Sequence, residues 1–121
     1  MQRVNKDIFK VLEDALPNKT GIYPTIADQN VRHPYVVYNC DGYTVDHSKD
    51  GIIGYRMEYR ISVCSDKFDE ADALADSLVN VLDGYRSSNI QQSYLSGGSS
   101  SFSDQTFCHS MDFIIVVDER K

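Results

Sequence analysis

The sequence predicts an α+β fold, a two-layer sandwich in which two helices pack on one face of a mainly antiparallel β-sheet. Three observations support this class: apolar residues recur at helical spacing near the N-terminus, they do so again over residues 67–83, and a long alternating pattern fills residues 55–64. Two amphipathic helices beside hairpin-linked strands bury their apolar sides by covering one sheet face. The expected order is α-β-β-β-α-β-β, in a single domain spanning residues 1–121.

The first helix is expected over residues 3–16. Pro17 cannot continue a helix interior, and Asn18 and Gly21 supply turn chemistry directly after it. Apolar side chains recur along one side of the segment, with charged residues between them: Val4, Ile8, Val11, Leu12, Ala15 and Leu16.

Two strands are expected next. The first, over residues 22–26, contains Pro24, which has no backbone N–H and therefore belongs at a sheet edge or a strand end. Residues 27–33 form a polar connector, and Pro34 starts the second strand. The mostly apolar, β-rich sequence YVVYNC at residues 35–40 indicates a strand that is central or covered on both faces.

A polar hairpin arm and a long strand follow. Turn residues at 41–42 and over 46–51 mark residues 41–54 as the arm. The next ten residues alternate between apolar and polar side chains, so one face is buried and the other is solvated or meets a partner. The buried set is Tyr55, Met57, Tyr59, Ile61 and Val63, and the other set includes Arg56, Glu58 and Arg60.

The second helix is expected over residues 67–83, with Asp66 as its N-terminal cap and Gly84 just beyond its end. Its apolar stripe is expected to consist of Phe68, Ala71, Leu74, Ala75, Leu78 and Leu82. Residues 87–106 are polar and serine-rich, which indicates a weak strand over 90–94 and a flexible stretch over 96–105. Residues 107–117 alternate strongly and form the last strand.

Charge and hydropathy argue against two classes of partner. The chain has 12 basic and 18 acidic residues, a formal net charge of −6. A dedicated nucleic-acid binder needs a basic patch to neutralise phosphates, and an anionic membrane surface attracts the same kind of patch. No apolar run approaches the roughly 18 residues of a transmembrane helix. The N-terminal residues also lack a signal-peptide pattern.

Residues that could support catalysis or bind a metal are few and dispersed. Cys40, Cys64 and Cys108 are widely spaced, so we expect free thiols in a reducing compartment rather than a disulfide framework. No cysteine or histidine pair has zinc-ligand spacing, and Gly97-Gly98 lacks the lysine of a phosphate loop. We therefore expect no enzyme activity, no metal and no cofactor. An enzyme using cysteine or histidine is the alternative, and thiol alkylation would inactivate it.

Exposed polar and aromatic residues are the candidates for a subunit or partner interface. Tyrosine is enriched at interfaces because an apolar ring bears a polar hydroxyl. A two-layer fold leaves one sheet face without helices, and a neighbouring subunit can cover that face. A solvated face of mixed charge is the alternative for its charged residues. The candidates are Tyr43, His47, Lys49, Asp50, Arg56, Glu58, Arg60, Tyr94, Phe102 and Asp104.

The order of elements and several short motifs resemble the tail-completion and tail-terminator (head–tail joining) proteins of tailed bacteriophages and prophages. The motifs are GIYP at residues 21–24, PYVVY at 34–38, RISVCS at 60–65, ADALADSLVNVLDG at 71–84 and MDFIIVV at 111–117. The resemblance covers nearly the whole chain, and these motifs are structural rather than catalytic.

The resemblance implies a non-enzymatic component of the virion tail or neck, present in the host cytoplasm during assembly. It implies a hexameric ring at the head-proximal end of the tail, which ends tube polymerisation and joins the tail to the neck or connector. The implied partners are further copies of the chain, the tail-tube protein and neck proteins, with no membrane. DNA passes through the lumen without specific binding.

Two other hypotheses remain open at this point. One is a different neck or tube component, such as a stopper, a head-completion protein or a tail-tube protein. The other is a small cellular adaptor or ligand-binding α+β domain. The latter predicts a monomer or dimer with a concave apolar pocket.

Overall fold

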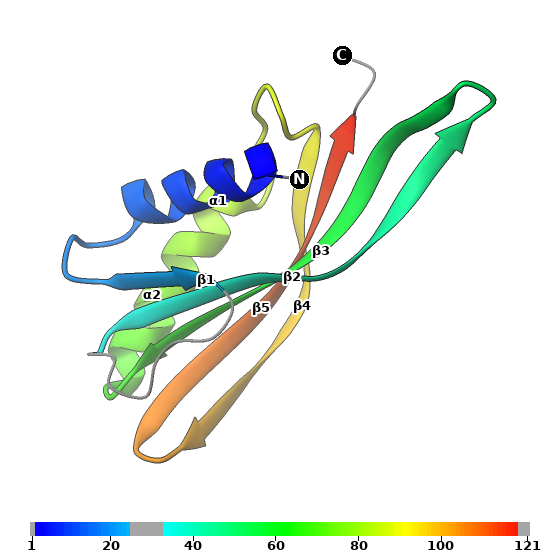
Figure 1. Ribbon diagram of the computed structural model, residues 1–121. Helices are drawn as coiled ribbons and strands as arrows, with labels where there is room; N and C mark the ends of the chain where they lie inside the picture. Colours follow the sequence, from blue (N-terminus) through cyan, green and yellow to red (C-terminus); the bar gives the residue numbers. More distant parts are fainter. Residues whose placement is uncertain (1, 25–32, 119–121) are drawn as a thin grey trace.

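The fold is a five-stranded sheet with two helices against one of its faces (Figure 1). The computed structural model describes residues 2–24 and 33–118. In chain order its elements are α1 (Gln2–Ala15), β1 (Gly21–Pro24), β2 (Tyr35–Ser48), β3 (Gly51–Ser65), α2 (Phe68–Leu82), β4 (Gln92–Ser103) and β5 (Thr106–Asp118). The predicted α+β class and the order α-β-β-β-α-β-β are confirmed.

The strands lie in the order β1-β2-β3-β5-β4, so β1 and β4 form the two edges. β1 runs parallel to β2, and the other three pairings are antiparallel. Pro24 ends β1 at one edge, where its missing N–H breaks no ladder bond. β2 has the predicted interior position, but helices cover one of its faces only. Val36 and Tyr38 are buried there, while Tyr35 and Val37 on the other face are half-buried.

The core fills the space between the helices and one sheet face. α1 buries Val4, Ile8, Val11 and Leu12 along one side, as the helical spacing predicts. β3 and β5 each bury every second residue, because successive side chains of a strand point to opposite faces. The buried strand residues are Met57, Tyr59, Ile61, Val63, Met111, Phe113, Ile115 and Val117, and α2 adds Ala71, Leu74, Ala75, Leu78 and Leu82.

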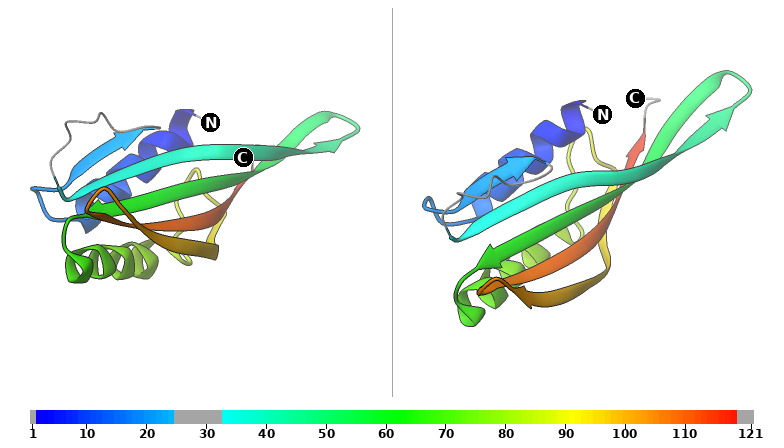
Figure 2. Two further views of the ribbon diagram at one scale, coloured as in Figure 1. Left: turned by 90° about the horizontal axis from the view of Figure 1, so that it is seen from below. Right: turned by 60° about the horizontal axis from the view of Figure 1, so that its bottom comes forward.

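The hairpin of β2 and β3 projects well beyond the helices and the other strands (Figures 1 and 2). β2 pairs with β3 along its whole length, from Tyr35 opposite Cys64 to Ser48 opposite Gly51. β1 pairs with β2 only as far as Tyr38, and β5 pairs with β3 only from Gly54 onward. The predicted polar arm is therefore a continuation of two core strands, not a loop.

Two local expectations are wrong. Residues 96–103 are not a flexible stretch: they continue β4, which pairs with β5 as far as Ser103. The serine-rich sequence resembles a linker because an edge strand with little buried surface needs few apolar residues. Asp66 does not cap α2. The helix begins at Phe68 after Lys67, without a side-chain cap, and Ser65 Oγ accepts the Lys67 N–H at 3.1 Å.

Gly54 lies where β3 and β5 pack closely against each other. A Cβ at this position would overlap the carbonyl oxygen of Val117. We expect Gly54→Ala to lower the free energy of unfolding by about 1–3 kcal/mol, because the backbone of β5 must shift to admit a methyl group.

Gly42→Ala is the matched control, since a Cβ there meets nothing within 4 Å. Urea denaturation of both variants measures the difference. Equal midpoints would contradict the close packing of β5 against Gly54.

Tyr59 is the largest fully buried side chain among the described residues, and its hydroxyl donates a hydrogen bond to Asn5 Oδ1 on α1. Burial raises the pKa of Tyr59 well above its ordinary value of 10.0, because the phenolate would lose its hydration. A raised pKa means that the folded state holds the phenol proton more tightly than the unfolded state. The resulting stabilisation is complete below pH 10 and is lost as the pH rises above it.

We therefore expect the melting temperature of the wild-type protein to fall more steeply between about pH 9 and about pH 11 than that of Tyr59→Phe. Phenylalanine has no ionisable hydroxyl, so the two proteins differ only in the ionisation of residue 59. Tyr38, whose pKa burial also raises, is present in both and cancels from the comparison. Thermal unfolding followed by circular dichroism provides the slopes, and identical slopes would contradict the burial of the Tyr59 hydroxyl.

Candidate functional site

The sheet face opposite the helices, which we call the open face, holds the three charged residues predicted on β3. Arg56, Glu58 and Arg60 all point away from the core and are exposed. Arg60 Nε lies 3.1 Å from Asp112 Oδ1 on β5 and 3.4 Å from Asp41 Oδ2 on β2. The hydrogen bond to Asp112, followed by the charge of Asp41, raises the pKa of Arg60 above its ordinary value. Arg60 thus bridges three strands.

Tyr94 of β4 joins the same face. The Arg56 guanidinium donates a hydrogen bond to the Tyr94 hydroxyl. Its Cζ also lies 5.9 Å from the centre of the Tyr94 ring, within cation–π range. Four of the predicted interface residues, on two different strands, therefore share one surface.

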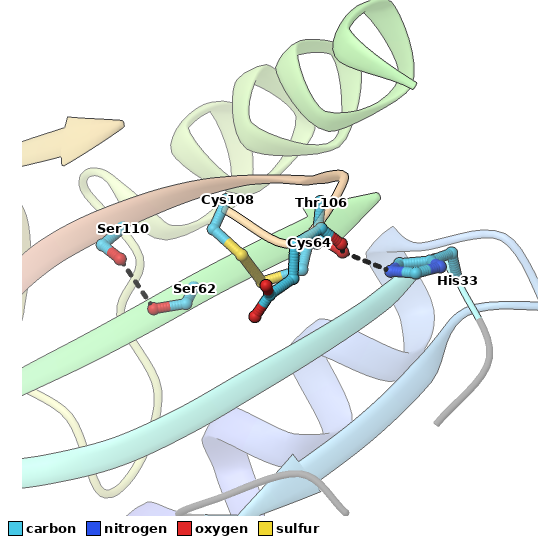
Figure 3. Close-up of a disulfide and its surroundings, with 7 residues drawn as sticks. His33, Ser62, Cys64, Thr106, Cys108 and Ser110 are labelled. Atoms are coloured by element: carbon cyan, nitrogen blue, oxygen red, sulfur yellow. Dashed lines mark hydrogen bonds between the residues drawn. A yellow bond between two sulfur atoms is a disulfide. The ribbon is translucent and has the colours of Figure 1, made fainter. Parts of the chain in front are cut away.

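Directly opposed pairs continue along the open face of β3 and β5 (Figure 3). Ser62 Oγ and Ser110 Oγ are 2.9 Å apart, and Cys64 is joined to Cys108 by a disulfide. With the Arg60–Asp112 ion pair they form three successive cross-strand links. A partner would meet a face whose side chains are already held in place.

The disulfide corrects the expectation of free thiols for Cys64 and Cys108. Their Cα atoms lie 4.2 Å apart because the antiparallel register places them directly opposite each other. Spacing along the chain contains no information about that register. Cys40 is free, as predicted, and donates from Sγ to the Gly42 carbonyl at 3.2 Å. Burial raises the pKa of the Cys40 thiol, which keeps it protonated.

The projecting end of the β2–β3 hairpin, residues 43–55, is a surface that we call the arm. It holds four predicted interface residues, of which His47, Lys49 and Asp50 are exposed at its tip. Tyr43 is 50% exposed and makes an edge-to-face contact with Tyr55, with ring centres 5.9 Å apart. Ile52 is exposed as well. The arm is therefore a polar hairpin with two uncovered apolar side chains.

A second exposed apolar surface lies at the opposite end of the sheet, between the start of α2 and the β4–β5 turn. We call it the aromatic groove. Its volume is about 270 Å³, and the side chains of Phe68, Phe102 and Phe107 line it. The ring centres of Phe102 and Phe107 are 4.4 Å apart, and those of Phe68 and Phe107 are 5.5 Å apart. Phe68 and Phe102 are 56% and 59% exposed.

The polar rim of the groove contains Asp72 and His109. His109 Nδ1 lies 3.9 Å from Asp72 Oδ1, too far for a hydrogen bond, and this nitrogen has no hydrogen-bond partner among the described residues. Asp104 lies in the adjoining turn with a backbone φ of 50°. Phe102 and Asp104 were predicted as interface residues, whereas Phe68 was assigned to the buried stripe of α2. Phe68 is the first residue of that helix and is exposed, so the buried part of the stripe begins at Ala71.

The predicted interface residues thus form three surfaces rather than one. The open face holds Arg56, Glu58, Arg60 and Tyr94, the arm holds Tyr43, His47, Lys49 and Asp50, and the end beside the groove holds Phe102 and Asp104.

Metal-ligating side chains are scattered over the described part of the chain. Across residues 2–24 and 33–118, no three His, Cys, Asp or Glu side chains gather in a way that could hold a metal ion. Neither helix in these two ranges is long and apolar enough to cross a membrane.

Comparison with known proteins finds a similar fold among solved structures but no matching family. No protein-family model and no curated protein matches the sequence. Among solved structures, the fold is similar to that of a chain from the virion of a native gene transfer agent (GTA) particle. The TM-score is 0.69 at 19% sequence identity, and the match covers 89% of this chain and 84% of that chain. The two chains therefore share a fold over most of their lengths.

Proposed function

We propose that this chain is a structural protein of a tailed phage, prophage or phage-derived particle, with no enzymatic role. In this proposal six copies form a ring at the head-proximal end of the tail, which stops tube growth and joins the tail to the neck. The observation that carries the proposal is the likeness to a virion chain over 89% of this chain. The sequence motifs named above support the finer assignment to the tail terminus.

The surfaces of the molecule support assembly with copies of itself. One face of the sheet has no helical cover, and the arm extends beyond the core, where nothing in residues 2–24 and 33–118 packs on it (Figure 2). Surfaces of this kind are stabilised when neighbouring subunits cover them. A net charge of −6 also suits a ring through which DNA slides. Tight DNA binding needs basic side chains that contact phosphates and release counterions, and an acidic chain offers few of them.

Immunogold electron microscopy of particles from a producing strain tests this role. We expect antibody against this chain to label one position per particle, at the head–tail junction. We also expect loss of the chain to yield detached heads and tails of uneven length. Label along the whole tube would indicate a tube protein instead, and an unlabelled particle would contradict a virion role.

A further inference from the structure

Two surfaces at opposite ends of the molecule expose apolar side chains that no described part of the chain covers. Tyr43 and Ile52 lie on the arm, and Phe68 and Phe102 lie at the aromatic groove. These are four of the seven large hydrophobic residues exposed among the described residues. Such patches at defined positions mark interaction sites more often than scattered exposed residues do.

The arm of one molecule cannot reach its own groove. β3 runs from Gly51 at the arm tip to Ser65 beside the groove, and Ser65 pairs with Phe107. Fifteen residues of extended strand span about 45 Å. Figure 1 shows the arm and the β4–β5 turn at opposite ends of the sheet. Any contact between the two surfaces must therefore join different copies.

Both ends carry more acidic than basic groups, because Asp46 and Asp50 flank Lys49 on the arm and Asp66, Asp69, Asp72 and Asp104 accompany Lys67 at the groove end, but each end has a lysine that can meet an acidic group of the other. Lys49 is exposed at the tip of the arm, and Asp72 lines the groove, with Asp69 exposed one turn earlier on α2. Asp50, beside Lys49 on the arm, is opposite in charge to Lys67, which directly precedes α2 at the groove end. Each end thus offers one basic and at least one acidic group to the other, together with its apolar side chains.

We propose that the arm of one copy docks in the aromatic groove of the next, with Ile52 against Phe68 and Phe102 and with Lys49 paired to Asp72. The inference rests on the proposed ring and identifies the contact that closes it. A contact between two different surfaces is head-to-tail, so repetition around an axis gives a closed ring without any twofold interface.

A head-to-tail contact has a signature in mixtures of variants. An arm variant, Lys49→Glu with Ile52→Asp, retains its groove, and a groove variant, Asp72→Lys with Phe102→Asp, retains its arm. Each alone is expected to associate at least tenfold more weakly than the wild-type chain, because apolar contacts and a charge pair are lost together. Mixed in equal amounts, they retain one intact arm and one intact groove per pair, so assembly stops at a heterodimer.

Native mass spectrometry of the wild-type chain, both variants and their mixture measures the outcome, and circular dichroism confirms that each variant is folded. Lys10→Glu is the matched control, since it reverses an exposed charge on α1 away from both surfaces. Hexamers for the wild type and control, monomers for each variant and heterodimers for the mixture are expected.

Variants that still form rings would overturn the arm-in-groove contact and leave the proposed function intact. Monomeric variants whose mixture gives no heterodimer would overturn the contact as well. A wild-type chain that never associates would overturn both the contact and the ring, and immunogold labelling would then decide the virion role separately.

Discussion

Phe113→Ala is expected to lower the free energy of unfolding by about 3–5 kcal/mol, a larger loss than that expected for Gly54→Ala. Phe113 is fully buried on β5, where it faces Tyr59 across one pairing and Leu95 across the other. Both helices pack on this side of the sheet, so the remaining side chains cannot collapse into the space without moving a helix. The loss combines the transfer energy of the ring with the cost of the cavity.

Ile114→Ala provides the matched comparison, because Ile114 follows on the same strand but lies half-buried on the open face. Urea denaturation of the two variants should show less than half the loss for Ile114→Ala. Equal losses would mean that both faces of β5 are covered in the isolated chain, which the described fold does not allow.

The second large effect is expected from opening the Cys64–Cys108 disulfide. The bond joins residues 44 positions apart, and closing a loop of that length in the unfolded chain corresponds to about 4 kcal/mol in the chain-entropy model. We therefore expect reduction, or the double substitution Cys64→Ala and Cys108→Ala, to lower the free energy of unfolding by about 2–4 kcal/mol.

Thiol counting checks this prediction independently of stability. The protein unfolded without reductant should expose one reactive thiol, that of Cys40, and three after reduction. Three reactive thiols before reduction would contradict the bond. One reactive thiol before reduction, together with unchanged stability after reduction, would confirm the bond but contradict the loop-closure argument for its stabilising effect.

Period-two alternation in the sequence was sufficient to predict β3 and β5, because their buried faces are continuous. Tyr59, Ile61 and Val63 alternate with polar residues, and the structure buries that set. β4 was missed beyond residue 94 because one of its sides is the sheet edge and its residues after Ser93 are not buried. An exposed strand of serine and glycine has the same amino-acid composition as a flexible linker.

The candidate surfaces were predictable in part. Exposure of the arm and of the charged face of β3 follows from local pattern, so Tyr43 and Arg60 could be predicted. The aromatic groove and the disulfide could not, because each joins positions far apart in sequence. Phe68 meets Phe107 where the start of α2 packs beside β5, and Cys64 meets Cys108 through the register of β3 against β5. That register depends on tertiary packing rather than on any short segment.

The central claim, a ring of six copies, is tested most directly by the mass of the purified wild-type chain in solution across a range of concentrations. Six chains of 13.7 kDa predict one closed species of about 82 kDa, without the ladder of intermediates that an open filament gives. A species of 13.7 kDa at every concentration would contradict the ring.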